Sequence, residues 1–123
     1  DLKSPNIFYE DNINPIFLDW QYIHLNKGIS DITFLLIESL DFDVITIDLV
    51  LKYYYKMSKN MYSSYDELLN DFKISLCIFP FFVCVWFNSE NNDNLLDKTF
   101  PIMFMKKLMT FYNYYLGDIE SLV

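Results

Sequence analysis

The side chains that could perform chemistry in this sequence are few, and the single histidine, His24, is the first to consider. A Ser-His-Asp or Cys-His mechanism needs a histidine base beside an activated nucleophile. His24 lies between Ile23 and Leu25, and nothing near it in the sequence indicates such a nucleophile. We therefore interpret His24 as a structural or surface residue and not as a catalyst.

The two cysteines, Cys77 and Cys84, are seven residues apart. On a helix this spacing separates their Cα atoms by roughly 10 Å, which is beyond the reach of a disulfide bond. A zinc site would need two further good ligands, and one histidine does not complete it. We interpret both as core residues. Because the sequence has no Asn-x-Ser/Thr sequon and no visible signal peptide, we expect a reducing compartment, the cytosol or nucleus.

Acidic residues are numerous, but their spacing matches no metal or phosphate motif. Residues 41–45 fail the calcium-loop pattern at its third ligand, where Ile45 stands. Residues 88–93 lack the central glycine and the closing glutamate of that loop. Two glycines are too few for a glycine-rich phosphate loop. A carboxylate pair for acid–base catalysis stays open, but nothing selects a pair among 17 acids. The sequence thus predicts no catalytic residue, metal or cofactor, and not an enzyme.

The charge balance excludes some partners. The 17 acids face nine lysines and no arginine, for a net charge of −8. Such a chain is a poor partner for phosphate backbones, so we expect no nucleic-acid binding, and an anionic membrane surface is disfavoured for the same reason. Hydrophobic residues make up 53% of the 123 residues, which is enough for one core. We expect a single domain over residues 1–123.

The longest apolar run is residues 74–87, ISLCIFPFFVCVWF. It is too short to span a bilayer, which needs roughly 20 residues. A run of this length without a polar face predicts a helix that is buried on all sides, in which Pro80 predicts a kink or a local break. A buried strand is the alternative, because β-branched and aromatic residues are common here. We favour the helix because residues 66–73 lead into it with a helical pattern.

Amphipathic helices are predicted before this run. Asn14-Pro15 has the pattern of an N-cap followed by a first-turn proline, and it predicts a helix that ends near Gly28. Ser30 is expected to begin a second helix, which extends to Leu40, and Asp43 to begin a third.

Further helices are predicted around and after the run. Ser64 begins a capping box before it, and residues 88–94 form the clearest loop after it. Residues 95–116 then predict a long helix, which Gly117 separates from a short last helix. The sum is an all-α bundle of about seven helices around residues 74–87.

The long helix predicted over residues 95–116 carries more apolar surface than a core face needs. One stripe suits the core: Phe104, Leu108, Phe111 and Tyr115. A second stripe, Met105, Met109 and Tyr112, has no obvious use within the chain. Exposed apolar patches mark protein interfaces, where Tyr and Met are enriched. The alternative is that the short terminal helix covers this second stripe.

Phe34 and Ile37 lie off the core face of the helix predicted from Ser30. Two interpretations stay open for them. They could line a groove for an amphipathic helix, or they could contact the next helix of the chain.

The plan of a central apolar helix wrapped by amphipathic ones resembles the Bcl-2 fold. Residues 74–88 resemble the fifth helix of the poxviral Bcl-2-like proteins, with Ser75-Leu-Cys77 in place of a Gly-Leu-Cys-type start and Trp86 at the helix end. Residues 20–26, WQYIHLN, are similar to the Tyr-Ile-x-Trp-Arg-Asn signature of the family's first helix. Residues 32–43, ITFLLIESLDFD, are similar to the following helix, which ends in a Leu-x-x-Phe-Asp-Asp-type turn.

This resemblance covers roughly residues 15–123. The sequence departs from the family in lacking a glycine before Leu76, in lacking arginine in the first helix, and in having Pro80. Its composition, without alanine and rich in Asn, Ile, Tyr, Phe and Lys, follows AT-rich codons and is consistent with many poxviruses. Helical cyclin-like domains share the plan but rank second, because the cyclin Lys and Glu that meet the kinase have no clear counterparts.

The resemblance implies a non-enzymatic virulence factor in the host cell cytoplasm. One branch of the family binds host adaptors and kinases of innate signalling and blocks NF-κB or interferon responses. The other sequesters amphipathic pro-apoptotic helices in a groove, usually with a C-terminal membrane anchor. Because the chain stops at Val123 without a membrane anchor, we expect the signalling branch, with apoptosis inhibition as the alternative.

Each branch carries a prediction of interface residues. Several members of the signalling branch dimerise through their first and sixth helices, so the expected homodimer or partner face is Trp20, Tyr22, Met105, Met109 and Tyr112. For the apoptosis inhibitor, the expected groove lies near Phe34, Ile37, Tyr53 and Phe72.

Overall fold

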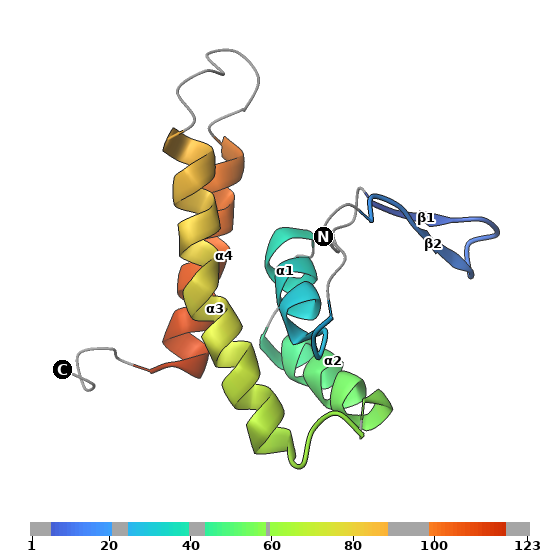
Figure 1. Ribbon diagram of the computed structural model, residues 1–123. Helices are drawn as coiled ribbons and strands as arrows, with labels where there is room; N and C mark the ends of the chain where they lie inside the picture. Colours follow the sequence, from blue (N-terminus) through green and yellow to red (C-terminus); the bar gives the residue numbers. More distant parts are fainter. Residues whose placement is uncertain (1–5, 21–24, 40–43, 59, 89–98, 118–123) are drawn as a thin grey trace.

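The computed structural model describes residues 6–20, 25–39, 44–58, 60–88 and 99–117. Within these ranges the chain forms a short hairpin followed by four helices (Figure 1). The elements are β1 (Ile7–Tyr9), β2 (Pro15–Phe17), α1 (Ile29–Ser39), α2 (Val44–Met57), α3 (Tyr65–Asn88) and α4 (Thr99–Tyr115). The class is mostly helical, as expected, but the described residues hold four helices where about seven were predicted. The short last helix lies outside the described residues.

The prediction of a helix that begins at Asn14-Pro15 is wrong, because β1 and β2 form an antiparallel hairpin there. Pro15 pairs with Tyr9, and its missing N–H costs little at the end of a two-stranded ladder. The turn at Asp11 favours a hairpin over a helix at this place. The Asp11 carboxylate accepts the backbone N–H of Ile13 at 3.3 Å and that of Asn14 at 2.9 Å, so Asp11 organises a turn where Asn14 was expected to cap a helix.

The helices predicted to begin near Ser30 and Asp43 are confirmed as α1 and α2 within one residue at their starts. The capping box is confirmed in part. The backbone N–H of Glu67 donates to the Ser64 hydroxyl at 3.1 Å, but the Glu67 carboxylate accepts from Ser63 in place of Ser64. Gly117 follows the last turn of α4 with a φ of 66°, the left-handed conformation that ends helices.

The apolar run is a helix and not a strand, because residues 65–88 form one continuous helix, α3. Pro80 lies inside α3 without ending it. The expectation that this helix is buried on all sides is wrong for its described side chains. Ile74 and Phe81 expose 59% and 73% of their surface. Over residues 65–81, whose side chains the structure describes, α3 therefore has one covered face and one exposed face.

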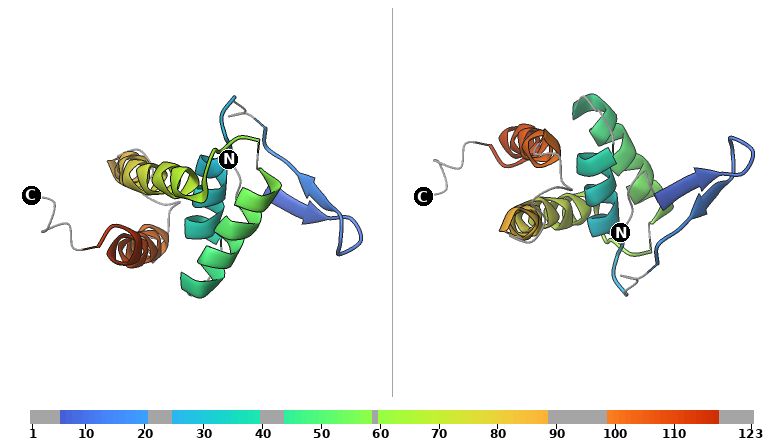
Figure 2. Two further views of the ribbon diagram at one scale, coloured as in Figure 1. Left: turned by 90° about the horizontal axis from the view of Figure 1, so that it is seen from below. Right: turned by 90° about the horizontal axis from the view of Figure 1, so that it is seen from above.

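The helices pack as two layers (Figure 2). α3 and α4 lie side by side, α1 packs against both of them, and α2 also contacts α3. The hairpin lies on the side of α1 and α2 that is remote from α4. All four helices contribute to the core, together with Tyr62 from the segment before α3. The largest fully buried hydrophobic side chains of this core are Leu36, Ile37, Ile47, Leu51, Leu68, Phe72, Leu76 and Leu108.

Candidate protein-binding surface

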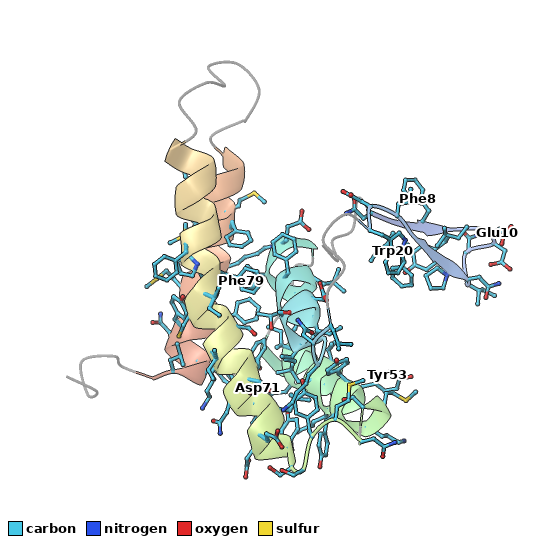
Figure 3. The ribbon with its side chains drawn as sticks, viewed as in Figure 1. Phe8, Glu10, Trp20, Tyr53, Asp71 and Phe79 are labelled. Atoms are coloured by element: carbon cyan, nitrogen blue, oxygen red, sulfur yellow. The ribbon has the colours of Figure 1, made fainter. Side chains whose placement is uncertain are left out.

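The inner face of α3 forms the centre of the core. Its buried residues follow helical spacing and meet the other three helices: Leu68, Phe72, Leu76 and Phe79. Phe79 points from α3 towards α1, where its ring stacks on that of Phe34 with centroids 5.4 Å apart (Figure 3). The side chains on this side of α3 are therefore buried by contacts within the chain.

The opposite face of α3 is also apolar, and it is exposed. Ile74, Cys77, Ile78 and Phe81 lie three or four residues apart, so they form one stripe along the helix. Ile78 exposes 49% of its surface, between the 59% of Ile74 and the 73% of Phe81. Exposed stripes of this kind are uncommon on isolated soluble domains and are typical of interaction sites.

A tyrosine joins α4 to α3 below this stripe. The Tyr112 hydroxyl donates to the backbone carbonyl of Leu76 at 2.7 Å. In a regular helix that carbonyl accepts the N–H four residues later, which is Pro80 and has no N–H. Burial raises the pKa of Tyr112 to about 12, and the nearby Cys77 contributes to the increase. Tyr112 is therefore a neutral donor that satisfies the carbonyl left free by Pro80.

The same flank of α4 extends the exposed surface. Met109 is three residues before Tyr112 and Ile102 is seven residues before Met109, so all three share one side of α4. Met109 exposes 49% and Ile102 exposes 51% of its surface. We refer to the combined surface as the α3–α4 outer face. It consists of Ile74, Cys77, Ile78, Phe81, Ile102 and Met109.

The segments that carry this face contain no acidic residue, a property that they share with residues 49–65 of α2 and the segment after it. The chain has a net charge of −8, yet no acid lies between Asp71 and Glu90 or between Asp97 and Asp118. Lysines are present in the same segments, with Lys73 half-buried on α3 and Lys106 exposed on α4. The α3–α4 outer face is thus apolar with a basic border, and a partner with acidic residues at the edge of its apolar surface would fit it.

The described residues of the predicted dimer face lie in two places: Trp20 follows the hairpin, whereas Met105, Met109 and Tyr112 lie together on α4. Trp20 follows β2, where 62% of its surface is exposed and its indole N–H donates to the carbonyl of Phe17 at 2.8 Å. α1 and α2 lie between Trp20 and α4 (Figures 1 and 3). Met105 and Tyr112 are partly buried against the core, and Met109 is exposed. The remaining residue, Tyr22, lies outside the described residues.

The four residues of the predicted groove are divided between the core and the surface. Ile37 and Phe72 have no exposed surface, so neither is available to a partner in this arrangement. Phe34 is partly buried and stacks on Phe79. Tyr53 exposes 65% of its surface on the outer side of α2 (Figure 3). The sequence left open a groove or a contact with the next helix, which is α2. The ring of Phe34 instead meets Phe79 on α3 and Phe104 on α4, and Ile37 is buried in the core.

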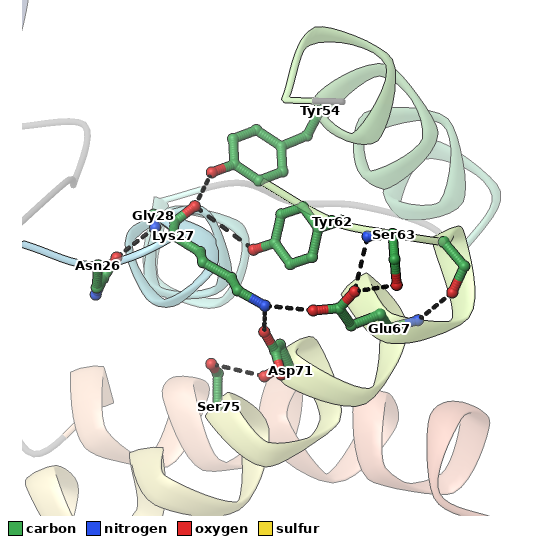
Figure 4. Close-up of polar contacts among 10 residues, drawn as sticks. Asn26, Lys27, Gly28, Tyr54, Tyr62, Ser63, Glu67, Asp71 and Ser75 are labelled. Carbon is green, nitrogen blue, oxygen red and sulfur yellow. Dashed lines mark hydrogen bonds and ion pairs between the residues drawn. The ribbon is translucent and has the colours of Figure 1, made fainter. Parts of the chain in front are cut away.

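A polar cluster at the start of α3 was not predicted (Figure 4). The Lys27 ammonium lies 2.5 Å from the Glu67 carboxylate and 3.3 Å from that of Asp71, and it covers the ring of Tyr62 at 4.7 Å. The Tyr54 hydroxyl donates to the carbonyl of Lys27. These contacts attach the segment before α1 to α2 and α3. They join residues 27 to 44 positions apart, and no local sequence pattern would reveal them.

Electrostatics within this cluster follow from its geometry. The hydrogen bond from Lys27 is the largest cause that lowers the pKa of Glu67, to about 2, and donors from Ser63 act in the same direction. The hydrogen bond to Glu67 is also the largest cause that raises the pKa of Lys27. Both carboxylate oxygens of Glu67 and one of Asp71 already accept hydrogen bonds from Lys27 or Ser63. We interpret the cluster as a structural clasp and not as a catalytic site.

The remaining chemical candidates give no further site. Cys77 is a free, exposed thiol, whereas His24 and the side chain of Cys84 lie outside the described part of the structure. Among the described residues, no three His, Cys, Asp or Glu side chains gather as metal ligands would. In the same part of the chain, no helix has the length and apolar character needed to cross a bilayer.

Comparisons of the chain with models of protein families, with curated protein sequences and with solved structures found no match.

Proposed function

We propose that this chain is a non-enzymatic protein-binding domain that binds host adaptors or kinases and suppresses innate NF-κB or interferon signalling in the host cell cytoplasm. The observation that carries protein binding is the α3–α4 outer face. It presents exposed apolar residues on two neighbouring helices, in segments that contain lysines and no acidic residue. The choice of innate signalling proteins as partners comes from the resemblance to the poxviral Bcl-2-like family.

Two properties make this face a suitable binding surface. Apolar side chains at half exposure gain free energy when a partner removes them from water, at about 25 cal/mol per Å². The face also lies on two helices that pack side by side and that Tyr112 joins through Leu76, so its two parts are held together before binding. A preorganised surface loses little conformational entropy when a partner docks.

Apoptosis inhibition stays the alternative from the resemblance, and no described contact favours it. Two of its four predicted groove residues, Ile37 and Phe72, are core residues with no exposed surface. Binding of a pro-apoptotic helix at that place would require α1 to separate from α3. Both functions can be tested in the same cells.

One experiment separates the two functions. The chain is expressed in human cells that carry NF-κB and interferon reporters, and cell death after an apoptotic stimulus is measured in parallel. We expect reduced reporter output with unchanged cell death. Reduced cell death, together with submicromolar binding of pro-apoptotic helix peptides in calorimetry, would support the alternative. No effect in either arm would contradict both functions.

A further inference from the structure

The hairpin segment, residues 6–20, is the second exposed apolar surface of the molecule. Seven of its large hydrophobic side chains have exposed fractions between 41% and 78%: Phe8, Tyr9, Ile13, Ile16, Phe17, Leu18 and Trp20. Figures 1 and 3 show that the hairpin projects away from the helices. A two-stranded hairpin on its own is marginally stable in water, so a hairpin with this composition is expected to gain stability from a docking surface.

The charge of the hairpin segment is opposite to that of the α3–α4 outer face. It contains Glu10, Asp11 and Asp19 and no lysine. The outer face contains no acid and is bordered by Lys73 and Lys106. Both surfaces are apolar at their centres. Each therefore has the chemistry required of a partner for the other, with apolar contact at the centre and opposite charges at the rim.

One chain does not bring these two surfaces together. The hairpin lies on the far side of α1 and α2, whereas the outer face lies on α3 and α4 at the other side of the molecule (Figure 2). A second copy of the chain presents the missing surface without any rearrangement of the helices. The repulsion expected between two copies of net charge −8 is locally reversed where an acidic segment meets a basic border.

We propose that the hairpin segment of one copy docks on the α3–α4 outer face of a second copy, head to tail. This inference rests on the proposed function in one respect, namely that the outer face binds protein, and it names a second copy as an occupant. A head-to-tail contact uses two different surfaces, so it closes into a ring or continues as a chain. Trp20 and Met109, which were predicted to share one interface, then meet between copies and not within one.

Complementary variants test this arrangement directly. The hairpin variant carries Phe8→Lys and Trp20→Lys, and the face variant carries Ile78→Glu and Phe81→Glu, all at exposed positions. We expect wild-type chain to self-associate in sedimentation velocity and each variant alone to be monomeric. Loss of such central contacts should weaken association by roughly 30-fold or more. The control is Leu49→Glu on α2, a residue with 63% exposure, which should associate as wild type.

Mixing the two variants gives the decisive result. The hairpin variant keeps an intact outer face and the face variant keeps an intact hairpin, so an equimolar mixture should form a one-to-one heterodimer and nothing larger. Formation of that heterodimer also shows that both variants fold. A mixture that stays monomeric, or wild-type chain that is monomeric at all concentrations up to millimolar, overturns the proposal. Absence of reporter inhibition by the wild-type chain would instead contradict the proposed function, because that assay does not require self-association.

Discussion

The hydroxyl of Tyr112 on α4 donates to the backbone carbonyl of Leu76 on α3 at 2.7 Å. That carbonyl lacks its usual helical donor, because the residue four positions later is Pro80. The contact explains two outcomes at once. α3 continues as one helix through Pro80, where a kink or a local break was expected. Tyr112, which had no obvious partner in the sequence, joins the two helices of the outer face.

Removal of the Tyr112 hydroxyl tests this relationship. Tyr112→Phe should lower the free energy of unfolding by about 1–2 kcal/mol, because it leaves a carbonyl in a partly buried place without a donor. Urea denaturation measures the change. Tyr114→Phe is the matched control. Its hydroxyl is 3.4 Å from Asp48 in an exposed contact, so its loss should have a smaller effect.

A double-mutant cycle with Pro80→Ala adds a sharper test. The alanine restores an N–H that bonds to the carbonyl of Leu76, so Tyr112→Phe should cost less in this background. A coupling of about 0.5 kcal/mol or more in that direction is expected. Equal losses in the two backgrounds would show that Tyr112 does not compensate for Pro80.

The clasp at Glu67 predicts a pH dependence of stability. The pKa of Glu67 is lowered to about 2 in the folded chain from a value of 4.5, chiefly by the hydrogen bond from Lys27. The folded state therefore binds fewer protons than the unfolded state between these values, so the stabilisation is present above about pH 4.5 and is lost as the pH falls towards 2.

The measurement is the thermal midpoint between pH 2 and pH 6. Glu67→Gln should flatten the loss of stability at acid pH, because the titrating group is removed. Asp66→Asn, an exposed carboxylate at the neighbouring position, provides the control and should leave most of the slope. An unchanged slope in Glu67→Gln would show that the clasp does not contribute to acid sensitivity.

The two faces of α3 should respond differently to truncation. Leu76 has no exposed surface, and its replacement by alanine should cost about 2–5 kcal/mol through lost burial and a cavity. Ile78 lies two residues further along the helix with 49% exposure, so Ile78→Ala should cost under about 1 kcal/mol. Urea denaturation of the pair measures both. Similar losses at the two positions would mean that the outer face is covered in solution.

Part of this fold could be predicted because local signals agree with it. The starts of α1 and α2 follow from capping residues and apolar periodicity, and Gly117 marks the end of α4. The hairpin could not be predicted in this way. Asn14-Pro15 suits the start of a helix as well as the start of a strand, and the turn at Asp11 decides between them.

The candidate site was hidden for a different reason. Residues 74–87 of α3 lack a polar face, so the sequence does not show which stripe the other helices cover. The choice depends on α1 and α4, which meet Phe79 and Leu76 but not Ile78. The clasp was hidden because Lys27 and Glu67 are 40 residues apart, and the capping box that contains Glu67 says nothing about a distant lysine.

The measurement that tests the central claim most directly is reporter inhibition by outer-face variants in stimulated human cells. Wild-type chain should suppress the NF-κB or interferon reporter. Ile78→Glu with Phe81→Glu should lose most of this suppression at equal expression, and Leu49→Glu should retain it. Full suppression by the outer-face variant, or no suppression by wild type, would contradict the claim that this face binds host signalling proteins.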